Sequence, residues 1–342
     1  MSEKLLEVKN LRVSYHTYAG EVQSVRGVSF TVNKGETVAV VGESGCGKSV
    51  TAKSIMRLIK TPPAEIKEGS EILFDGEDVL QFNEKRLCAY RGGEVAMVFQ
   101  DALAALNPTM TVGNQIMENL RHHTKLSKKE AKARAVELLR MVGIPQPESR
   151  VDQYPHEFSG GMRQRVMIAI AFACDPKLLI ADEPTTALDV TIQAQIIDLI
   201  KALQKEKNAS VILITHDLGV VANIADRIVV MYAGQIVERG PSVEVFHHPR
   251  HPYTNALLEA VPRLDLENKQ TLASIEGTPP DLIAPPKGCP FCTRCKYCME
   301  ICCEQQPPVL NFGDGHEAGC WLYKLETPAA DAPFTQEAHY EG

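Results

Sequence analysis

Short apolar runs alternate with amphipathic segments along most of this chain. Predominantly apolar runs occur at residues 37–41, 94–99, 178–182, 209–214 and 227–231. Runs of this length and composition are typical of parallel strands that helices cover on both faces. The alternation therefore predicts the α/β class, with a mostly parallel sheet and helices on its faces.

The pattern becomes helical and strand-poor between Gln100 and Cys174. Within it, residues 127–139 form a charged amphipathic segment, with Ser127 as a helix N-cap and Gly143 as its stop. We expect a helical subdomain at about residues 101–175 that is inserted into the core. The alternative is a set of ordinary crossover helices.

A glycine-rich segment follows the apolar run at residues 37–41 and precedes a predicted helix at residues 50–59. Its glycines allow the backbone N–H groups to surround a phosphate, and the helix N-terminus adds positive potential. In such a loop Lys48 contacts the β- and γ-phosphates and the Ser49 hydroxyl ligates Mg²⁺. The residues assigned to nucleotide binding here are Gly42, Ser44, Gly45, Cys46, Gly47, Lys48, Ser49 and Val50.

Further polar motifs fit phosphate chemistry. Asp182 and Glu183 end an apolar run, where Asp182 suits a Mg²⁺ contact and Glu183 suits a base for water. A solvated turn is the alternative for these two carboxylates. Residues 159–161 (Ser-Gly-Gly) begin a predicted helix, and the N-terminus of such a helix is a potential anion site. Asp189 lies shortly after the acidic pair, and His216 lies shortly after the apolar run at residues 209–214.

Together these motifs resemble the ATP-binding cassette of ABC transporters, from about Leu5 to Gly240. The resemblance implies a P-loop NTPase fold with a RecA-like core and an inserted helical subdomain. It implies that Tyr15 stacks on adenine, with Tyr18 as a substitute, and that Gln100 senses Mg²⁺ and the attacking water.

The same resemblance implies a site shared by two ATPase chains. Ser159, Gly160 and Gly161 match the signature motif, which closes over the γ-phosphate bound to the partner. Asp189 matches the D-loop aspartate and His216 the switch histidine. Every catalytic position holds the family's consensus residue, so we expect an active ATPase.

Three shorter motifs, at residues 105–108, 154–156 and 251–254, resemble the di- and oligopeptide (and nickel) importer branch. This implies a subunit that energises peptide import, with a second related ATPase, two permeases and an extracytoplasmic binding protein as partners. Import of nickel or another small solute is an alternative, and so is a non-transport ABC ATPase. The latter predicts long coiled-coil insertions, tandem cassettes or a basic surface, which this sequence lacks.

Composition adds three constraints. With 342 residues the chain exceeds one typical domain. The net charge of −7 argues against a large nucleic-acid interface. The longest apolar run, residues 166–174, is too short to span a bilayer, and no apolar signal core follows Met1. We expect a peripheral location at the cytoplasmic face of the membrane, with a cassette at 1–250, an extension at 251–330 and a flexible tail at 331–342.

Cysteine is concentrated in the extension. Its seven cysteines are Cys289, Cys292, Cys295, Cys298, Cys302, Cys303 and Cys320. Dense cysteine in a reducing compartment indicates a metal site, either an iron–sulfur cluster or zinc. The spacing of the first four differs from that of a ferredoxin, which has a longer last interval and a terminal proline.

Peptide-importer ATPases resemble this region as well. Their pattern falls on Cys289, Cys295, Cys302 and Cys320, with Arg294 and His316 also matching. The resemblance implies that these four cysteines bind a 4Fe–4S cluster, with zinc as the alternative metal. The pattern does not require Cys292, Cys298 or Cys303. A redox-sensing role for the extension is a secondary hypothesis.

Overall fold

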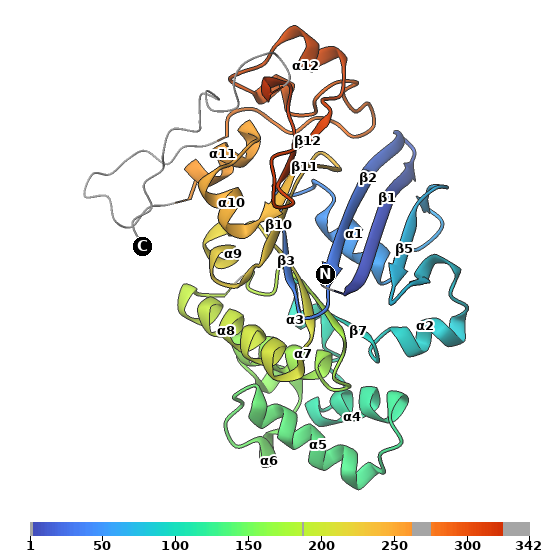
Figure 1. Ribbon diagram of the computed structural model, residues 1–342. Helices are drawn as coiled ribbons and strands as arrows, with labels where there is room; N and C mark the ends of the chain where they lie inside the picture. Colours follow the sequence, from blue (N-terminus) through green and yellow to red (C-terminus); the bar gives the residue numbers. More distant parts are fainter. Residues whose placement is uncertain (1–2, 187, 262–274, 324–342) are drawn as a thin grey trace, which may run out of the picture. The chain divides into compact units, whose positions relative to one another are not determined.

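The computed structural model describes residues 3–186, 188–261 and 275–323 (Figure 1). These residues form two compact units, each built from three segments of the chain. The described residues of Met1–Leu6, Val32–Thr37 and Leu73–Ile214 form the first unit, and those of Glu7–Thr31, Val38–Ile72 and Thr215–Gly342 form the second. No helix in these described ranges combines the length and apolarity that a bilayer span requires.

The first unit contains three parallel strands. β7 (Val95–Val98) pairs with β8 (Leu178–Asp182), which pairs in turn with β9 (Ser210–Thr215). Every residue of these strands is buried, which explains their uninterrupted apolar pattern. A short antiparallel pair consists of β5 (Glu71–Phe74) and β6 (Glu77–Asp78), in which Leu73 and Phe74 lie opposite the two residues of β6.

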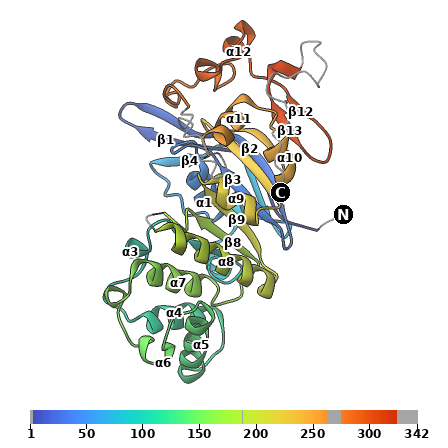
Figure 2. The ribbon, with the colours of Figure 1, turned by 90° about the vertical axis from the view of Figure 1, so that its left-hand side faces the viewer.

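Helices make up most of the rest of the first unit. They are α2 (Glu84–Tyr90), α3 (Ala102–Ala105), α4 (Val112–His123), α5 (Lys128–Met141), α6 (Pro147–Arg150), α7 (Gly160–Ala171) and α8 (Val190–Lys207), with the 3-10 turns η1 (Val79–Gln81) and η2 (Pro155–Glu157). α4, α5 and α7 pack against one another (Figure 2). Ser127 is the N-cap of α5, as the sequence predicts, and it forms a capping box with Glu130.

The second unit contains the N-terminal strands and the C-terminal region. Its strands are β1 (Lys4–Thr17), β2 (Gly20–Asn33), β3 (Thr37–Val41), β4 (Ala64–Ile66), β10 (Arg227–Tyr232), β11 (Gln235–Pro241), β12 (Val309–Asn311) and β13 (Glu317–Gly319). Its helices are α1 (Lys48–Ile55), α9 (Leu218–Ile224), α10 (Ser242–His247), α11 (Pro252–Glu259) and α12 (Glu300–Glu304), with the 3-10 turns η3 (Cys292–Arg294) and η4 (Trp321–Tyr323). β3 and β10 are parallel.

The sheet of the second unit continues into the Cys-rich extension. β11 pairs antiparallel with β10 on one side and with β13 on the other, and β13 pairs with β12. One apolar core joins strand residues such as Tyr232 to Tyr253, Phe291 and Trp321. The extension therefore packs as part of this unit rather than as a separate domain.

The five strands predicted from apolar runs are confirmed to within two residues at each end. The strand-poor stretch between Gln100 and Cys174 is confirmed for the described residues. The long strands β1 and β2 were not predicted, nor were β11, β12 and β13. The predicted flexible tail at 331–342 lies outside the described residues.

Candidate functional site: nucleotide residues and a cysteine cluster

The glycine-rich loop connects β3 to α1 in the second unit. Gly42 has a φ of 148°, and a Cβ there would lie 2.1 Å from the carbonyl oxygen of Met231. Gly47 has a φ of 102°, and its Cβ would lie 2.5 Å from the carbonyl oxygen of Ser24. Only glycine fits these two positions, because both the space and the φ exclude a side chain. Gly45, with a φ of 80°, lies at an exposed position.

Lys48 is buried, with 5% of its surface exposed, although it carries a charge. Its Nζ donates to the carbonyl oxygens of Gly42, at 2.7 Å, and Glu43, at 2.9 Å. These bonds hold the ammonium group inside the loop. Ser44 is exposed, Cys46 is buried and Ser49 and Val50 are half-buried at the start of α1. Such a loop presents amide donors and a cation to a phosphate group.

The acidic pair lies in the first unit, at the carboxyl end of β8. Asp182 is the last residue of the strand and is buried. Glu183 follows with a φ of 48°, in the left-handed region. The Gln100 side-chain amide donates to Glu183 Oε2 at 2.9 Å, and the Thr186 hydroxyl donates to the same oxygen at 2.9 Å. The structure thus brings the side-chain amide of Gln100 to the carboxylate of Glu183.

Thr186 was not assigned a role from the sequence. Its hydroxyl fixes the carboxylate of Glu183 from three residues further along the chain. In the sequence, the signal for this contact is a hydroxyl-bearing residue three positions after Glu183.

The signature residues begin α7 in the same unit. Ser159 is the N-cap, and its hydroxyl accepts the N–H of Met162 at 3.4 Å. A Cβ on Gly161 would lie 2.9 Å from Cγ2 of Ile192 in α8, so glycine allows these helices to approach. Asp189 caps α8 by accepting the Ile192 N–H at 3.0 Å. Gly160 is exposed.

Tyr15 and His216 belong to the second unit. Tyr15 is half-buried in β1, opposite Ala64 in β4, whereas Tyr18 is fully exposed. His216 is exposed and directly follows β9. Asp217 then caps α9 by accepting the N–H groups of Gly219 and Val220. The predicted nucleotide residues therefore belong to two sets, one in each unit.

Five of the seven cysteines of the extension line a cavity of about 20 Å³, together with His251, Phe291 and Trp321. They are Cys289, Cys292, Cys295, Cys302 and Cys320. Burial, followed by the neighbouring cysteines, raises the pKa of both Cys289 and Cys320 to about 12. The family resemblance assigns four of these five, all except Cys292, to metal binding.

Two exposed cysteines approach each other outside this cavity. Cys298 Sγ lies 3.8 Å from Cys303 Sγ. Burial and a side-chain hydrogen bond with Cys303 raise the pKa of Cys292. Among the described residues, no three His, Cys, Asp or Glu side chains are arranged to hold a metal ion.

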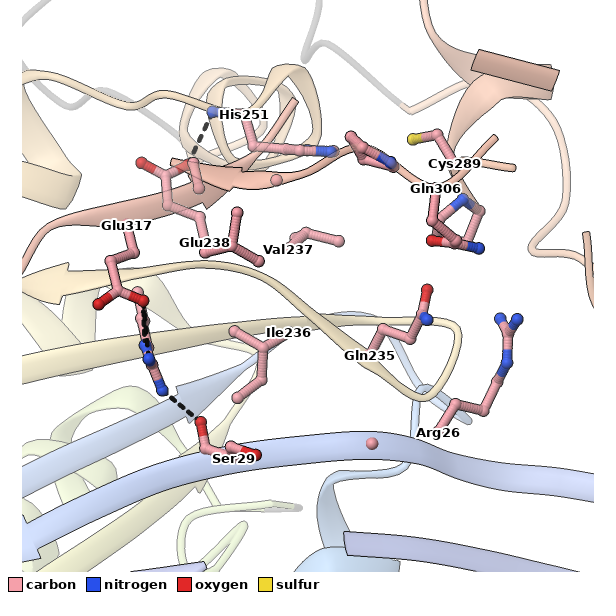
Figure 3. Close-up of a pocket in the computed structure, with 17 residues that line it drawn as sticks. Arg26, Ser29, Gln235, Ile236, Val237, Glu238, His251, Cys289, Gln306 and Glu317 are labelled. Atoms are coloured by element: carbon pink, nitrogen blue, oxygen red, sulfur yellow. Dashed lines mark hydrogen bonds and ion pairs between the residues drawn. The ribbon is translucent and has the colours of Figure 1, made fainter. Parts of the chain in front are cut away.

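A larger cavity of about 350 Å³ lies between β2, β11, β13 and the extension (Figure 3). On its wall the Glu238 carboxylate is fully buried and accepts the backbone N–H groups of Arg250 and His251, at 2.7 and 2.8 Å. His316 Nε2 lies 2.7 Å from the same carboxylate and must donate to it, since a carboxylate only accepts. Burial lowers the pKa of His251 to about 3, so its ring is neutral.

Comparison with known proteins decides the family. Residues 25–186 match the family described as ABC transporter, and residues 237–302 match the C-terminal region of oligopeptide/dipeptide transporters. The chain is 58% identical to the oligopeptide transport ATP-binding protein OppD of Bacillus subtilis, over 96% of this chain and 92% of the relative. It is 55% identical to the dipeptide transport ATP-binding protein DppD of the same species, over 94% of this chain and 95% of the relative.

The chain belongs to the ABC transporter family. Among solved structures it is similar to MJ0796, a dimeric ATP-binding cassette in a post-hydrolysis state with ADP and Pi, at a TM-score of 0.62 and 28% identity. That match covers 69% of this chain and 98% of the other. The prediction of an ABC cassette of the peptide-importer branch is confirmed, and with it the ABC-type ATPase activity and the use of ATP and Mg²⁺.

For this ABC ATPase, the individual site residues and the iron–sulfur cluster remain predictions. The sequence analysis did not identify two acidic residues that bind the extension. Glu43, inside the glycine-rich loop, binds Arg294, and Glu238, in β11, binds His316. β11 has the sequence Gln-Ile-Val-Glu-Arg-Gly-Pro, so its local pattern gives no signal that Glu238 is buried.

Proposed function

We propose that this chain is the ATP-hydrolysing subunit that energises import of di- and oligopeptides across the cell membrane. The supporting observation is its close similarity to oligopeptide and dipeptide transport ATP-binding proteins, which extends through both the cassette and the C-terminal region. Its partners are a second homologous ATPase, two permeases and an extracytoplasmic binding protein. It acts at the cytoplasmic face of the membrane as a peripheral subunit.

In this proposal two ATPase chains enclose two ATP molecules. The loop with Lys48 holds the phosphates, and Ser49, Gln100 and Asp182 surround Mg²⁺. Glu183 orients and deprotonates the attacking water while His216 contacts the γ-phosphate. Ser159, Gly160 and Gly161 close over the nucleotide of the partner chain, and Asp189 and Tyr15 complete the contacts. ATP binding closes the dimer, hydrolysis reopens it, and these motions drive the permeases.

The test is ATP hydrolysis by the complete transporter in proteoliposomes. With the peptide-loaded binding protein present, we expect hydrolysis to rise and labelled peptide to accumulate inside. The same assay with Ni²⁺ and its binding protein is the arm for the alternative. Stimulation by Ni²⁺ alone, or ATPase activity with no dependence on any permease, contradicts the proposal. The isolated chain should bind no peptide, because selectivity resides in the partners.

We also propose a domain division: a cassette at 1–250 with a helical subdomain at about 101–175, and a Cys-rich extension at 251–330. In the extension, Cys289, Cys295, Cys302 and Cys320 bind a 4Fe–4S cluster. What supports this proposal is the chemistry of the donors: all four thiols, together with that of Cys292, line one small cavity, and thiolates are the ligands of iron–sulfur clusters. Zinc is the alternative metal, because it also accepts four cysteine ligands.

When bound, such a cluster supplies four metal–thiolate bonds that order a short, proline-containing segment. Anaerobically purified protein should contain iron and acid-labile sulfide in equal amounts. Substitution of any of the four cysteines by serine should remove both, whereas Cys292→Ser, Cys298→Ser and Cys303→Ser should retain both. Zinc without sulfide in this protein contradicts the cluster, and iron loss from the Cys292 variant contradicts the ligand set.

A further inference from the structure

The Cys-rich extension binds the phosphate loop through one arginine. Arg294, at the end of η3, donates from Nη1 to Glu43 Oε2 at 2.6 Å and from Nη2 to Glu43 Oε1 at 2.9 Å. Only 3% of the Arg294 side chain is exposed. A bidentate pair of this kind fixes both the distance and the plane of the carboxylate. The two residues are 251 positions apart in the sequence.

The guanidinium group of Arg294 is fully engaged. Besides Glu43, it donates to the carbonyl oxygens of Glu276 at 2.9 Å and Ile275 at 3.0 Å, and to the Tyr232 hydroxyl at 3.1 Å. These bonds and the two to Glu43 use all five of its N–H donors. Arg294 therefore has one defined position, which depends on residues of the extension and of β10.

Glu43 is also held at its backbone. Its N–H donates to the Tyr253 hydroxyl at 2.8 Å, and its carbonyl oxygen accepts from Lys48 Nζ at 2.9 Å. The rings of Tyr232 and Tyr253 lie 4.6 Å apart, and each lies 5.3 Å from the ring of Phe291 in the extension. The residue that holds Lys48 is thus bonded to the extension through both its side chain and its backbone N–H.

The charge of Glu43 has a direct consequence for nucleotide binding. A carboxylate inside a loop that binds phosphate repels the nucleotide, and a neighbouring guanidinium group cancels this repulsion. We propose that Arg294 is a positioning residue of the ATPase site, which holds the Glu43 carboxylate and neutralises its charge so that it does not repel the nucleotide. Nucleotide affinity then depends on whether the Cys-rich extension presents Arg294 to Glu43.

The competing explanation is that the pair only attaches the extension to the cassette. A second ion pair provides the matched control. Arg239 in β11 donates to Glu317 Oε2 in β13 at 2.7 and 3.1 Å, and so joins the cassette to the extension without a contact to the phosphate loop. Removal of Arg239 loses this pair and a hydrogen bond to the carbonyl oxygen of Ser29 in β2, and neither partner belongs to the phosphate loop.

The experiment compares Arg294→Met, Glu43→Gln, the double variant and Arg239→Met in the full chain. The readout is the Kd for Mg-ATP, from displacement of a fluorescent ATP analogue, at low and high salt. Arg294→Met should raise Kd about 10-fold at low salt, because an unpaired carboxylate then remains inside the phosphate loop. The increase should shrink in about 0.5 M salt. Glu43→Gln alone should not raise Kd.

The decisive measurement is made on the double variant, which combines Arg294→Met with Glu43→Gln. Since Glu43→Gln removes the unpaired charge, the Kd of the double variant should lie within about 3-fold of the parent value. Arg239→Met should leave Kd unchanged. Equal impairment of the single and double variants, or of Arg294→Met and Arg239→Met, overturns the proposal.

Two further measurements guard against misfolding. Arg294→Lys keeps the positive charge but not the bidentate geometry, so its Kd should lie between those of the parent and Arg294→Met. In the assembled transporter, Arg294→Met should raise KM for ATP with little change in kcat. A lowered kcat at unchanged KM in Arg294→Met, when its circular dichroism spectrum equals that of the parent, also overturns the proposal.

Discussion

Replacement of Glu238 by glutamine should open the attachment between β11 and the extension. The carboxylate is fully buried and accepts three hydrogen bonds: from the N–H groups of Arg250 and His251 and from His316. Glutamine offers one oxygen and one NH₂ group. In either orientation of this amide, one backbone N–H faces another donor.

The stability lost in Glu238→Gln can be worked out from these contacts. One hydrogen bond to a charged group is lost, which costs about 1.5–3 kcal/mol, and the other two become weaker hydrogen bonds to a neutral amide. The sum is about 3–5 kcal/mol, which is also the usual cost of breaking a buried ion pair. Since β11 pairs with β13 directly at Glu238, opposite Ala318, the loss should fall on this part of the sheet.

Amide hydrogen exchange, followed by mass spectrometry, measures this local opening. Peptides that cover β11 and β13 should lose at least about 100-fold of their protection in Glu238→Gln. The control is Glu244→Gln in α10, where a carboxylate with 40% exposure pairs with His248 at the surface. That variant should change stability by no more than about 0.5 kcal/mol. A change below about 10-fold in the Glu238 variant refutes the reasoning.

Three further predictions concern the nucleotide residues. Glu183→Gln should retain ATP binding and lose about 10²–10⁴-fold of steady-state hydrolysis, and near-normal single turnover in the assembled transporter excludes Glu183 as the base. Ser159→Arg should abolish hydrolysis at the partner's phosphate loop while its own chain still binds ATP; in mixed complexes, damage confined to its own site argues against a shared site. Gly161→Ala should lower the thermal midpoint because its Cβ meets Ile192 Cγ2 at 2.9 Å, and Ile192→Ala should restore part of the loss; an unchanged midpoint contradicts this.

The local features were predictable because they depend on neighbours in the sequence. Buried parallel strands leave apolar runs, and the capping box of Ser127 and Glu130 requires only three residues of spacing. The strand β1 was missed for an equally local reason. Asn10 has a φ of 48°, so the buried positions shift from 6 and 8 to 11 and 13, and the alternation is interrupted.

The sequence by itself determined the glycine-rich loop, the residue types of the ATPase and the concentration of cysteine in the extension. Each of these features lies in the identity and spacing of nearby residues. Only the tertiary structure decided that Arg294 meets Glu43 and that His316 meets Glu238. Such pairs join distant segments, and their formation depends on how sheet pairing and the shared aromatic core bring the extension onto β10 and β11, which no local pattern encodes.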